Sequence, residues 1–422
     1  MSVVQKLQTR RLKFAATLND EVLSETTDED YELKYIDIGN VDSSGRVHEI
    51  ETYEFGKAPS RARRKVRDGD VIISTVRTYL QAIASISEPD ENLIVSTGFA
   101  VARPNRDLLE TGSFKYALRE PRFLYEVEAR STGVSYPAIN SSELADIRIQ
   151  LPSLAAQRRI AHYLDAEMAQ IDALVAEKER MLELLDETRA AFISRTVTCG
   201  LDPNTPTRPT GIHWLGEVPK HWALKRGKLL FHEVDDRSDT GEETLLSLRM
   251  ERGLVPHNDV SEKPIAPQHL IGYKRVRTGE IVLNRMRAAS GLVAVASEDG
   301  IVSPDYAVFD MIGDESPHYF VALFKTRLLQ SVFRALSKGL GTGKSGFLRL
   351  YSEDFLAITF PVPPSSPKSE QDAIVAAIRR DAERTADLRM TLSDSTKLLK
   401  ERRAALISAA VTGEIEPGLG EP

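Results

Sequence analysis

The chain of 422 residues contains one unit twice, and this repeat constrains its fold more than any other feature. Residues 157–203 match residues 371–417 at a constant spacing of 214, without a gap. The matching strings are RAAFISRTVTCGLDP with RAALISAAVTGEIEP and, more loosely, RDGDVIISTVR with RTGEIVLNRMR. A duplication of this size predicts two related domains, each followed by a helix, with approximate twofold symmetry within one chain.

The segment before each helical repeat has the pattern of a mixed α/β (α+β) domain, which we call a head. The first head has candidate strands in YELKYIDIGNV, DVIISTV and LIVSTGFAVA, and the second in TLLSLRM, EIVLNRM and IVSPDYAVFDM. A helix is expected over 112–130, where Pro121 is a candidate break, and another over 317–336. The expected boundaries are a first head at 1–150, a linker at 201–211, a second head at 212–362 and a tail at 416–422.

Two long helices are predicted, at 151–200 and 363–415, because apolar residues recur there at spacings of three and four. The residues predicted to pack between the helices are Ile160, Leu164, Ile171, Leu174, Met181, Leu185, Phe192, Ile374, Ile378, Leu388, Leu392, Leu399 and Leu406. An ordinary core helix is the alternative, but such helices average about 11–12 residues. An antiparallel coiled coil about 60 Å long would separate the two heads.

Composition excludes several classes of protein. A single cysteine, Cys199, rules out an internal disulfide, and the eight histidines have no metal-ligand spacing. There is no run of 18 apolar residues and no signal-peptide segment, so neither a membrane span nor secretion is expected. We therefore expect a cytoplasmic protein without a metal.

The net charge is −7, but base is concentrated at the same place in both repeats. Residues 57–77 carry seven Lys/Arg against two Asp, and residues 274–287 carry five against one Glu. A solvated basic turn explains either cluster alone, whereas recurrence in both copies favours contact with nucleic-acid phosphates. The predicted DNA contacts are Arg61, Arg63, Arg64, Lys65, Arg67 and Arg77, then Lys274, Arg275, Arg277, Asn284, Arg285 and Arg287. Among these, Asn284 and Arg285 are the candidates for bidentate base contacts.

No motif in the chain carries catalysis. The string GLGTGKSGF at 339–347 fails as a phosphate-binding loop, because Lys338 stands where the pattern requires glycine. We expect a surface loop that approaches DNA, with Thr342, Lys344 and Ser345 matched by Thr132, Ser135 and Tyr136 in the first head; an ordinary mobile loop is the alternative. SPDY at 303–306 lacks the second proline of a methyltransferase motif and an upstream glycine-rich loop. No catalytic residue and no bound cofactor are therefore predicted.

The order and duplication of LPSLAAQRRIAHYLDAEMAQIDALV, RAAFISRTVTCGLDP and WLGEVPKHW resemble the specificity subunits of type I restriction–modification systems over nearly the whole chain. The resemblance implies two target-recognition domains, each reading one half of a bipartite, gapped DNA sequence. It implies that the helices dock methyltransferase subunits, two of them in our expectation, and that restriction and translocation subunits join the complex. S-adenosylmethionine, ATP and Mg²⁺ would belong to those partners.

Two other hypotheses remain open from the sequence. A self-contained DNA methyltransferase or nuclease would bind S-adenosylmethionine as an isolated chain. A coiled-coil scaffold without a DNA role would make the basic clusters incidental and would give no gel shift at moderate salt.

Overall fold

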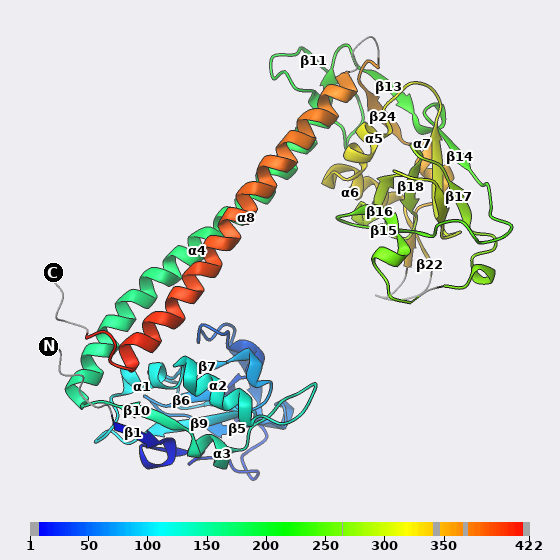
Figure 1. Cartoon of the computed structure of the whole chain (residues 1–422). Helices are drawn as coiled ribbons and strands as arrows, with labels where there is room; N and C mark the ends of the chain where they lie inside the picture. The colour runs from blue at the N-terminus through cyan, green and yellow to red at the C-terminus, as the bar shows by residue number, and fades with distance from the viewer. Residues whose placement is uncertain (1–7, 264, 341–346, 366–369, 417–422) are drawn as a thin grey trace. The chain divides into compact units, whose positions relative to one another are not determined.

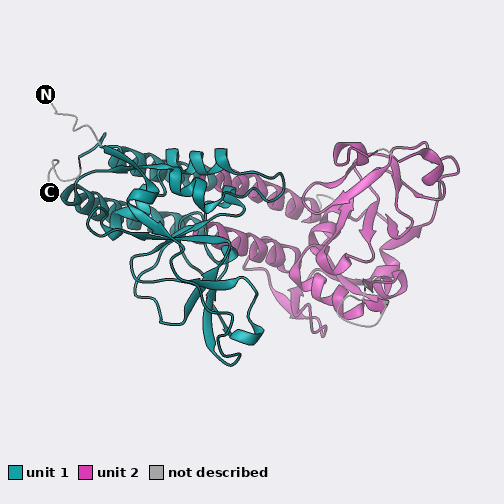
Figure 2. Ribbon diagram, turned by 90° about the horizontal axis from the view of Figure 1, so that it is seen from below, with its two compact units in different colours: residues 1–179, 393–422 teal, residues 180–392 magenta. Residues whose placement is uncertain are grey.

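The computed structural model describes residues 8–263, 265–340, 347–365 and 370–416. The chain divides into two compact units, coloured separately in Figure 2: unit 1 is Met1–Glu179 with Ser393–Pro422, and unit 2 is Arg180–Leu392. Each unit holds one sheet-rich head and a part of both long helices. Each is described by itself below.

The head of unit 1 is built on two four-stranded sheets (Figure 1). One is antiparallel, in the order β2 (Ala16–Leu18), β9 (Phe99–Pro104), β6 (Val71–Ser74), β7 (Ile83–Ser85). The other runs β4 (Glu51–Glu54), β3 (Glu32–Ile36), β8 (Leu93–Ser96), β5 (Ala62–Lys65), with β3 parallel to β8.

Strand β6 lies between two hydrophobic cores because both of its faces are apolar. Val71 and Ile73 join the core formed with the helices, which include Phe114 and Phe123. Ile72, on the opposite face, joins the core shared with the second sheet. The alternation of side chains along a strand, period two, thus places the VIIS segment at the centre of the head.

Short helices cover the head of unit 1: α1 (Thr111–Ala117), α2 (Pro121–Arg130) and α3 (Ser141–Asp146). The predicted helix at 112–130 is broken at Pro121, which occupies the first turn of α2, while the Glu120 side chain accepts from the N–H groups of Arg122 and Phe123. Strand β1 (Gln8–Arg11) pairs with β10 (Arg148–Leu151), so the chain enters and leaves the head side by side.

The head of unit 2 repeats this plan. Its main sheet runs β14 (Phe231–Val234), β21 (Tyr306–Met311), β18 (Ile281–Asn284), β19 (Val293–Val295), and β13 (Ala223–Arg226) pairs with β24 (Thr359–Val362) as β1 pairs with β10. The helices are α5 (Pro317–Phe324), α6 (Arg327–Leu336) and α7 (Ser352–Ala357). Two-stranded ladders complete it: β11 (Thr207–Pro209) with β12 (Glu217–Pro219), β15 (Leu246–Arg249) with β16 (Gly253–Pro256), β17 (Lys274–Val276) with β20 (Gly300–Val302), and β22 (Lys338–Leu340) with β23 (Phe347–Arg349).

The long helices are α4 (Leu154–Cys199), of 46 residues, and α8 (Glu370–Val411), of 42. In unit 1 the first turns of α4 pack against the last turns of α8, with Leu164 and Ile407 in one core, and Glu167 pairs with Arg402. In unit 2 Val197 of α4 shares a core with Ile374 of α8. The helices are therefore antiparallel, and the predicted fold class, two α/β heads in tandem with long paired helices, is confirmed.

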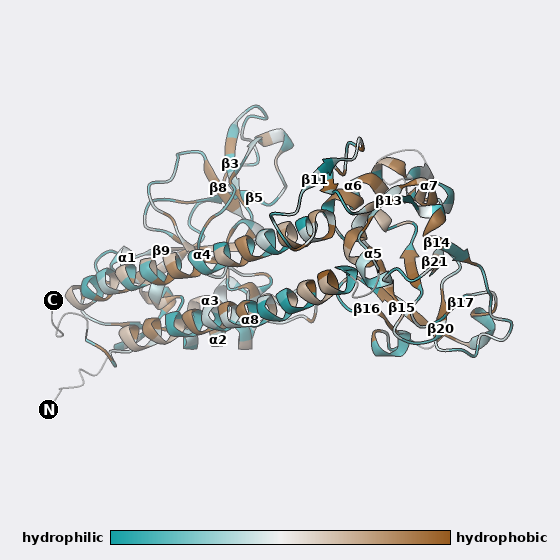
Figure 3. Ribbon diagram, turned by 90° about the horizontal axis from the view of Figure 1, so that it is seen from above, coloured by the Kyte–Doolittle hydropathy of each residue, from teal (hydrophilic) through white to brown (hydrophobic). Residues whose placement is uncertain are grey.

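Along the predicted packing stripe, the residues near the ends of the helices are buried and several in the middle are exposed. Ile160, Leu164, Ile171 and Ile374 are buried, and Leu185, Phe192, Ile378, Leu392, Leu399 and Leu406 are half-buried. Leu174, Met181 and Leu388 are 43, 43 and 47% exposed. A 3.5-residue pattern drifts about 20° per heptad on a straight helix, so the seam passes to neighbours such as Val175, and hydrophobic residues appear on more than one face in Figure 3.

A buried glutamine fixes the start of each long helix to its own head. The Gln157 side chain donates to the carbonyl of Pro152 at 2.9 Å and accepts from the Glu110 N–H at 2.8 Å. Gln371 makes the equivalent bonds, donating to a proline carbonyl at 2.8 Å and accepting a backbone N–H at 2.7 Å. Both side chains are buried away from water. These hydrogen bonds therefore satisfy amide donors and acceptors that would otherwise have no partner.

Candidate nucleic-acid interface

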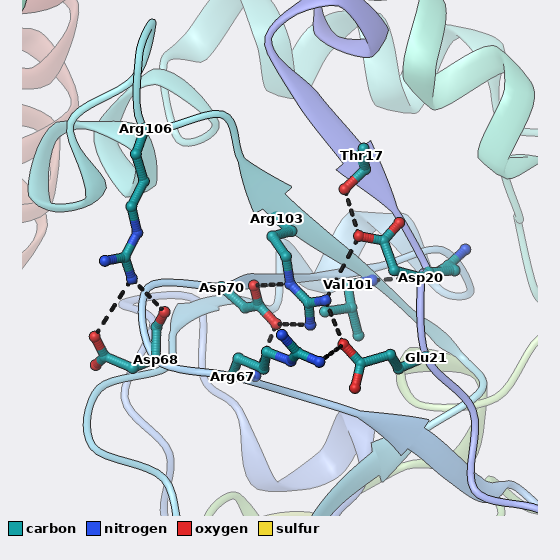
Figure 4. A network of polar contacts seen from close by, with 10 residues as sticks. Thr17, Asp20, Glu21, Arg67, Asp68, Asp70, Val101, Arg103 and Arg106 are labelled. Carbon is teal, nitrogen blue, oxygen red and sulfur yellow. Dashed lines mark hydrogen bonds and ion pairs between the residues drawn. The ribbon is translucent and has the colours of Figure 1, made fainter.

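A network of ion pairs anchors the turn that leads into β6 (Figure 4). The buried Asp70 carboxylate accepts from the Arg67 N–H at 2.8 Å and from Arg103 Nε and Nη2 at 2.9 and 2.8 Å. Arg103 also pairs with Glu21, and this hydrogen bond is the largest cause that lowers the pKa of Glu21. The same carboxylates raise the pKa of Arg103, which stays charged, and β6 therefore projects from a rigid base.

The predicted contacts of the first basic cluster separate into two groups. Arg67 is exposed but pairs with Glu21 at 2.7 Å. On β5, Arg63 stacks over the Phe55 ring at 4.6 Å, and the Arg64 Nε is buried without a partner among the described residues. Arg63, Arg64 and Lys65 are half-buried, and burial lowers the pKa of Arg64. Arg61 and Arg77 remain exposed.

Backbone hydrogen bonds gather the exposed residues at the end of β6. Ile139 N–H donates to the Thr75 carbonyl at 2.9 Å, and Arg77 N–H donates to Pro137 at 2.8 Å. Thr97 N–H donates to Arg61 at 2.8 Å, while its neighbour Gly98 accepts from Thr75. We call the surface they form the first rim, made of Arg61, Arg77, Tyr79, Thr132, Ser135 and Tyr136. All of its members are exposed.

The Arg77 guanidinium lies over the Tyr136 ring, 4.9 Å from its centroid. Tyr79 and Tyr136 are 55 and 62% exposed, which leaves two large aromatic side chains of the first rim open to a partner surface. Arginine and exposed tyrosine together offer a positive charge and a flat stacking face, the combination that nucleic-acid surfaces use.

In the second head one predicted contact is buried and another, still 34% exposed, is paired with acids of the same head. Lys274 is buried, and its Nζ lies 3.5 and 3.4 Å from carboxylates of Glu233 and Asp235. Glu243 accepts a hydrogen bond from the Ser238 hydroxyl, which is the largest cause that lowers the pKa of Glu243 to about 2, and Arg275 pairs with the same carboxylate at 2.9 Å. These two cations neutralise acids of their own domain.

The predicted base-reading pair is also engaged internally. Arg285 pairs with Glu233 and donates to Ser352 Oγ at 3.0 Å, and only 16% of its side chain is exposed. The Asn284 Oδ1 accepts from the N–H groups of Met286 and Arg287 at 3.0 and 3.1 Å. A bidentate adenine contact needs that oxygen, so the geometry does not favour the predicted contact.

The second head nevertheless has a matching surface at the end of β18. Leu350 N–H donates to the Arg285 carbonyl at 3.0 Å, as Ile139 does to Thr75 in the first head. We call this the second rim; it comprises Arg287, Ser290, Arg349 and Tyr351. Among the other predicted contacts, Arg277 is exposed but lies in the turn before β18, and Thr342, Lys344 and Ser345 lie outside the described residues.

The sequence analysis misses Tyr79, Arg349 and Tyr351. Arg349 lies 5.8 Å from the Tyr351 ring centroid and repeats the arginine–tyrosine pair of the first rim. The sequence pattern that could have identified them is an aromatic residue beside a basic one in the loops around each basic cluster. It was weak because the loops of the two heads differ in sequence.

The described residues contain neither three His, Cys, Asp or Glu side chains grouped to hold a metal nor a helix that could cross a membrane. Residues 23–183 match the model of the type I restriction modification DNA specificity domain. The specificity domain thus begins in the first head and extends into α4.

Relatives extend the likeness beyond the matched specificity domain. The putative type I restriction enzyme MjaX specificity subunit of Methanocaldococcus jannaschii is 22% identical over 354 residues, 80% of this chain and 77% of the relative. A solved chain from a type I restriction–modification system matches with a TM-score of 0.71 and 21% identity, and the HsdS subunit of Thermoanaerobacter tengcongensis with 0.50 and 20%. Each match covers 97% of this chain and 98% of the solved chain. The resemblance to type I specificity subunits is therefore confirmed.

Proposed function

We propose that this chain is the sequence-specific DNA-binding subunit of a type I restriction–modification complex, in which each head reads one half of a bipartite, gapped site. The observation that carries the proposal is the repeated rim. Both heads end their central strand, β6 or β18, in a short turn beside an exposed arginine, Arg77 or Arg287, and an arginine–tyrosine pair. Arginines there would contact phosphates, and the turn tips would reach base edges.

The long helices would dock the partner subunits. Apolar side chains stay exposed on them, including Leu174, Met181 and Leu388, where the seam has drifted away. Exposed apolar side chains on a helix are typical of sites of protein association. Two methyltransferase subunits would bind there, and restriction and translocation subunits would join them. In this scheme S-adenosylmethionine, ATP and Mg²⁺ are bound by the partners, and this cytoplasmic chain performs no catalysis.

The salt dependence of binding to duplex DNA of mixed sequence tests the phosphate contacts. Each phosphate contact contributes about 0.9 to the slope of log affinity against log salt. The double variant R61Q/R77Q should reduce the slope by about 1.8. R106Q is the matched control, because Arg106 is exposed but pairs with Asp68 at the far end of β6. An unchanged slope in R61Q/R77Q would remove the first rim from the interface.

Exchange of residues 1–150 for the first head of a relative tests whether each head reads its half-site independently. The chimera should change one half of the sequence methylated by the complete complex and leave the other half unchanged. A change in both halves would contradict independent reading. Tight S-adenosylmethionine binding by the isolated chain would instead favour the self-contained methyltransferase, and absence of any DNA binding would favour the scaffold.

A further inference from the structure

The two rims carry a 3-10 turn at the same place with different side chains at its tip, although the residue before the turn is left-handed only in the first head. In the first head the 3-10 turn Thr78–Leu80 follows β6, and in the second head Ala288–Ser290 follows β18. Each turn ends at a residue in the left-handed conformation: Gln81 with φ 49° and Gly291 with φ 73°. The tip therefore changes from Tyr-Leu-Gln in one head to Ala-Ser-Gly in the other, on one scaffold.

The first head holds its tip in a conformation that glycine would adopt with less strain. Arg77, before the turn, and Gln81, after it, both have positive φ, at 53° and 49°. Such angles are unfavourable for residues with a Cβ, and they persist where the surrounding structure imposes them. Here the side chain of Gln81 donates to Glu128 at 3.0 Å, and Thr78 Oγ1 lies 2.8 Å from Ser131 Oγ. Both anchors lie at the C-terminal end of α2.

The anchored turn presents apolar groups to solvent. Tyr79 and Leu80 are 55 and 37% exposed, although Thr78 beside them is buried. Arg77 flanks them and is already stacked on Tyr136. The strained backbone and the exposed Tyr79 do not stabilise the folded head by themselves. An exposed aromatic ring beside an arginine instead suits contact with a nucleic acid.

We propose that the 79–81 tip is a specificity determinant of the first head, in which the Tyr79 ring packs against base edges of its half-site in a groove of the duplex while Arg77 holds the adjoining phosphate. The second head, whose tip ends in Ser290 and Gly291, reads its half-site without an aromatic side chain at this tip. This inference rests on the proposed function and assigns the difference between the two half-sites to these positions. The bases preferred by the first head then depend on Tyr79.

Selection of bound duplexes from a random-sequence pool by the full chain tests the inference, because one experiment reports both half-sites. The variants are Y79A, Y79F and the transplant Y79A/L80S/Q81G, which gives the first head the tip of the second and leaves the buried Thr78 intact. Tyr125, 70% exposed on α2 outside the rim, provides the matched control Y125A. Y79A and the transplant should change the enriched sequence at one or two positions of one half-site only. Y79F and Y125A should enrich the wild-type sequence.

The outcomes separate failure of the inference from failure of the proposed function. An unchanged second half-site in the same selected duplexes shows that a variant is folded and bound. If Y79A and the transplant enrich the wild-type sequence in both halves, the tip does not read bases and the inference is wrong. A change in both halves would also overturn it. A wild-type chain that enriches no sequence contradicts the proposed function itself.

Discussion

Replacement of Arg103 by methionine should destabilise the first head by about 3 kcal/mol. Asp70 is 1% exposed and receives hydrogen bonds from Arg103 at 2.9 and 2.8 Å and from one backbone N–H. Without Arg103 its carboxylate stays buried with that single donor, and breaking a buried pair on one side costs roughly 3–5 kcal/mol. The Arg103 side chain is 22% exposed, so water reaches part of the site and the lower figure applies.

Urea unfolding of the full chain can separate the two units by their probes. Both tryptophans, Trp214 and Trp222, lie in unit 2, so their fluorescence follows that unit, while far-UV circular dichroism follows both. At a slope of about 2 kcal/mol/M, R103M should lower the midpoint of the unit 1 transition by about 1.5 M and leave the fluorescence transition in place. The double variant R103M/D70N should recover part of the loss, because it removes the unpaired charge.

The pH dependence of stability provides a second test of the Arg103 ion pairs. The hydrogen bond from Arg103 lowers the pKa of Glu21 from its ordinary value of 4.5, so this pair stabilises the fold at neutral pH. The contribution is lost as pH falls through the lowered pKa, and the gap between wild type and R103M should therefore narrow below pH 4.5. Equal destabilisation of R103M and R103M/D70N, with a gap independent of pH, would refute the reasoning.

Three further outcomes follow from the packing of the chain. L164A, at a fully buried position, should cost about 3 kcal/mol, whereas L174A, at an exposed one, should change stability by less than about 0.5 kcal/mol, as measured by urea midpoints. Q371A removes both hydrogen bonds of the Gln371 side chain and should lower the urea midpoint of the tryptophan fluorescence transition. A midpoint equal to that of the wild type would show that these hydrogen bonds are dispensable. Burial raises the pKa of Glu280, so its ionisation costs stability as pH rises through that pKa. E280Q should therefore stabilise unit 2 at pH 7.5 with a gain that shrinks on acidification, and a gain that does not vary with pH would point to packing instead.

The sequence predicted the duplication, the two heads and the long helices because each depends on local periodicity and on self-similarity. It placed the end of the first long helix at 200, and α4 ends at Cys199. Leu174 and Met181 were misplaced because a small angular drift per turn accumulates along a helix of 46 residues. A heptad pattern alone does not show where a straight helix leaves its seam.

The charge clusters were predicted correctly as sequence features and only partly as surfaces. Counting neighbours along the chain ignores acids that the fold brings in from elsewhere. Lys274 pairs with Glu233, 41 residues away in the chain, and Arg67 pairs with Glu21, 46 residues away. The exposed remainder, such as Arg77, could be identified only once these internal pairs were known.

Comparison of the two repeats shows which residues are kept for the fold and which differ at the exposed turns. The buried clamp at Gln157 recurs at Gln371, and the carboxylate that caps the turn before the central strand recurs as Asp70 and Glu280. Buried hydrogen-bonding groups tolerate little change, because an unsatisfied donor or acceptor costs about 1–3 kcal/mol. Exposed turn tips carry no such cost, so two copies of one domain can diverge at positions 79–81 while the backbone beneath them stays the same. Under the proposed function, two heads that read different half-sites would use this division between a fixed scaffold and a variable tip.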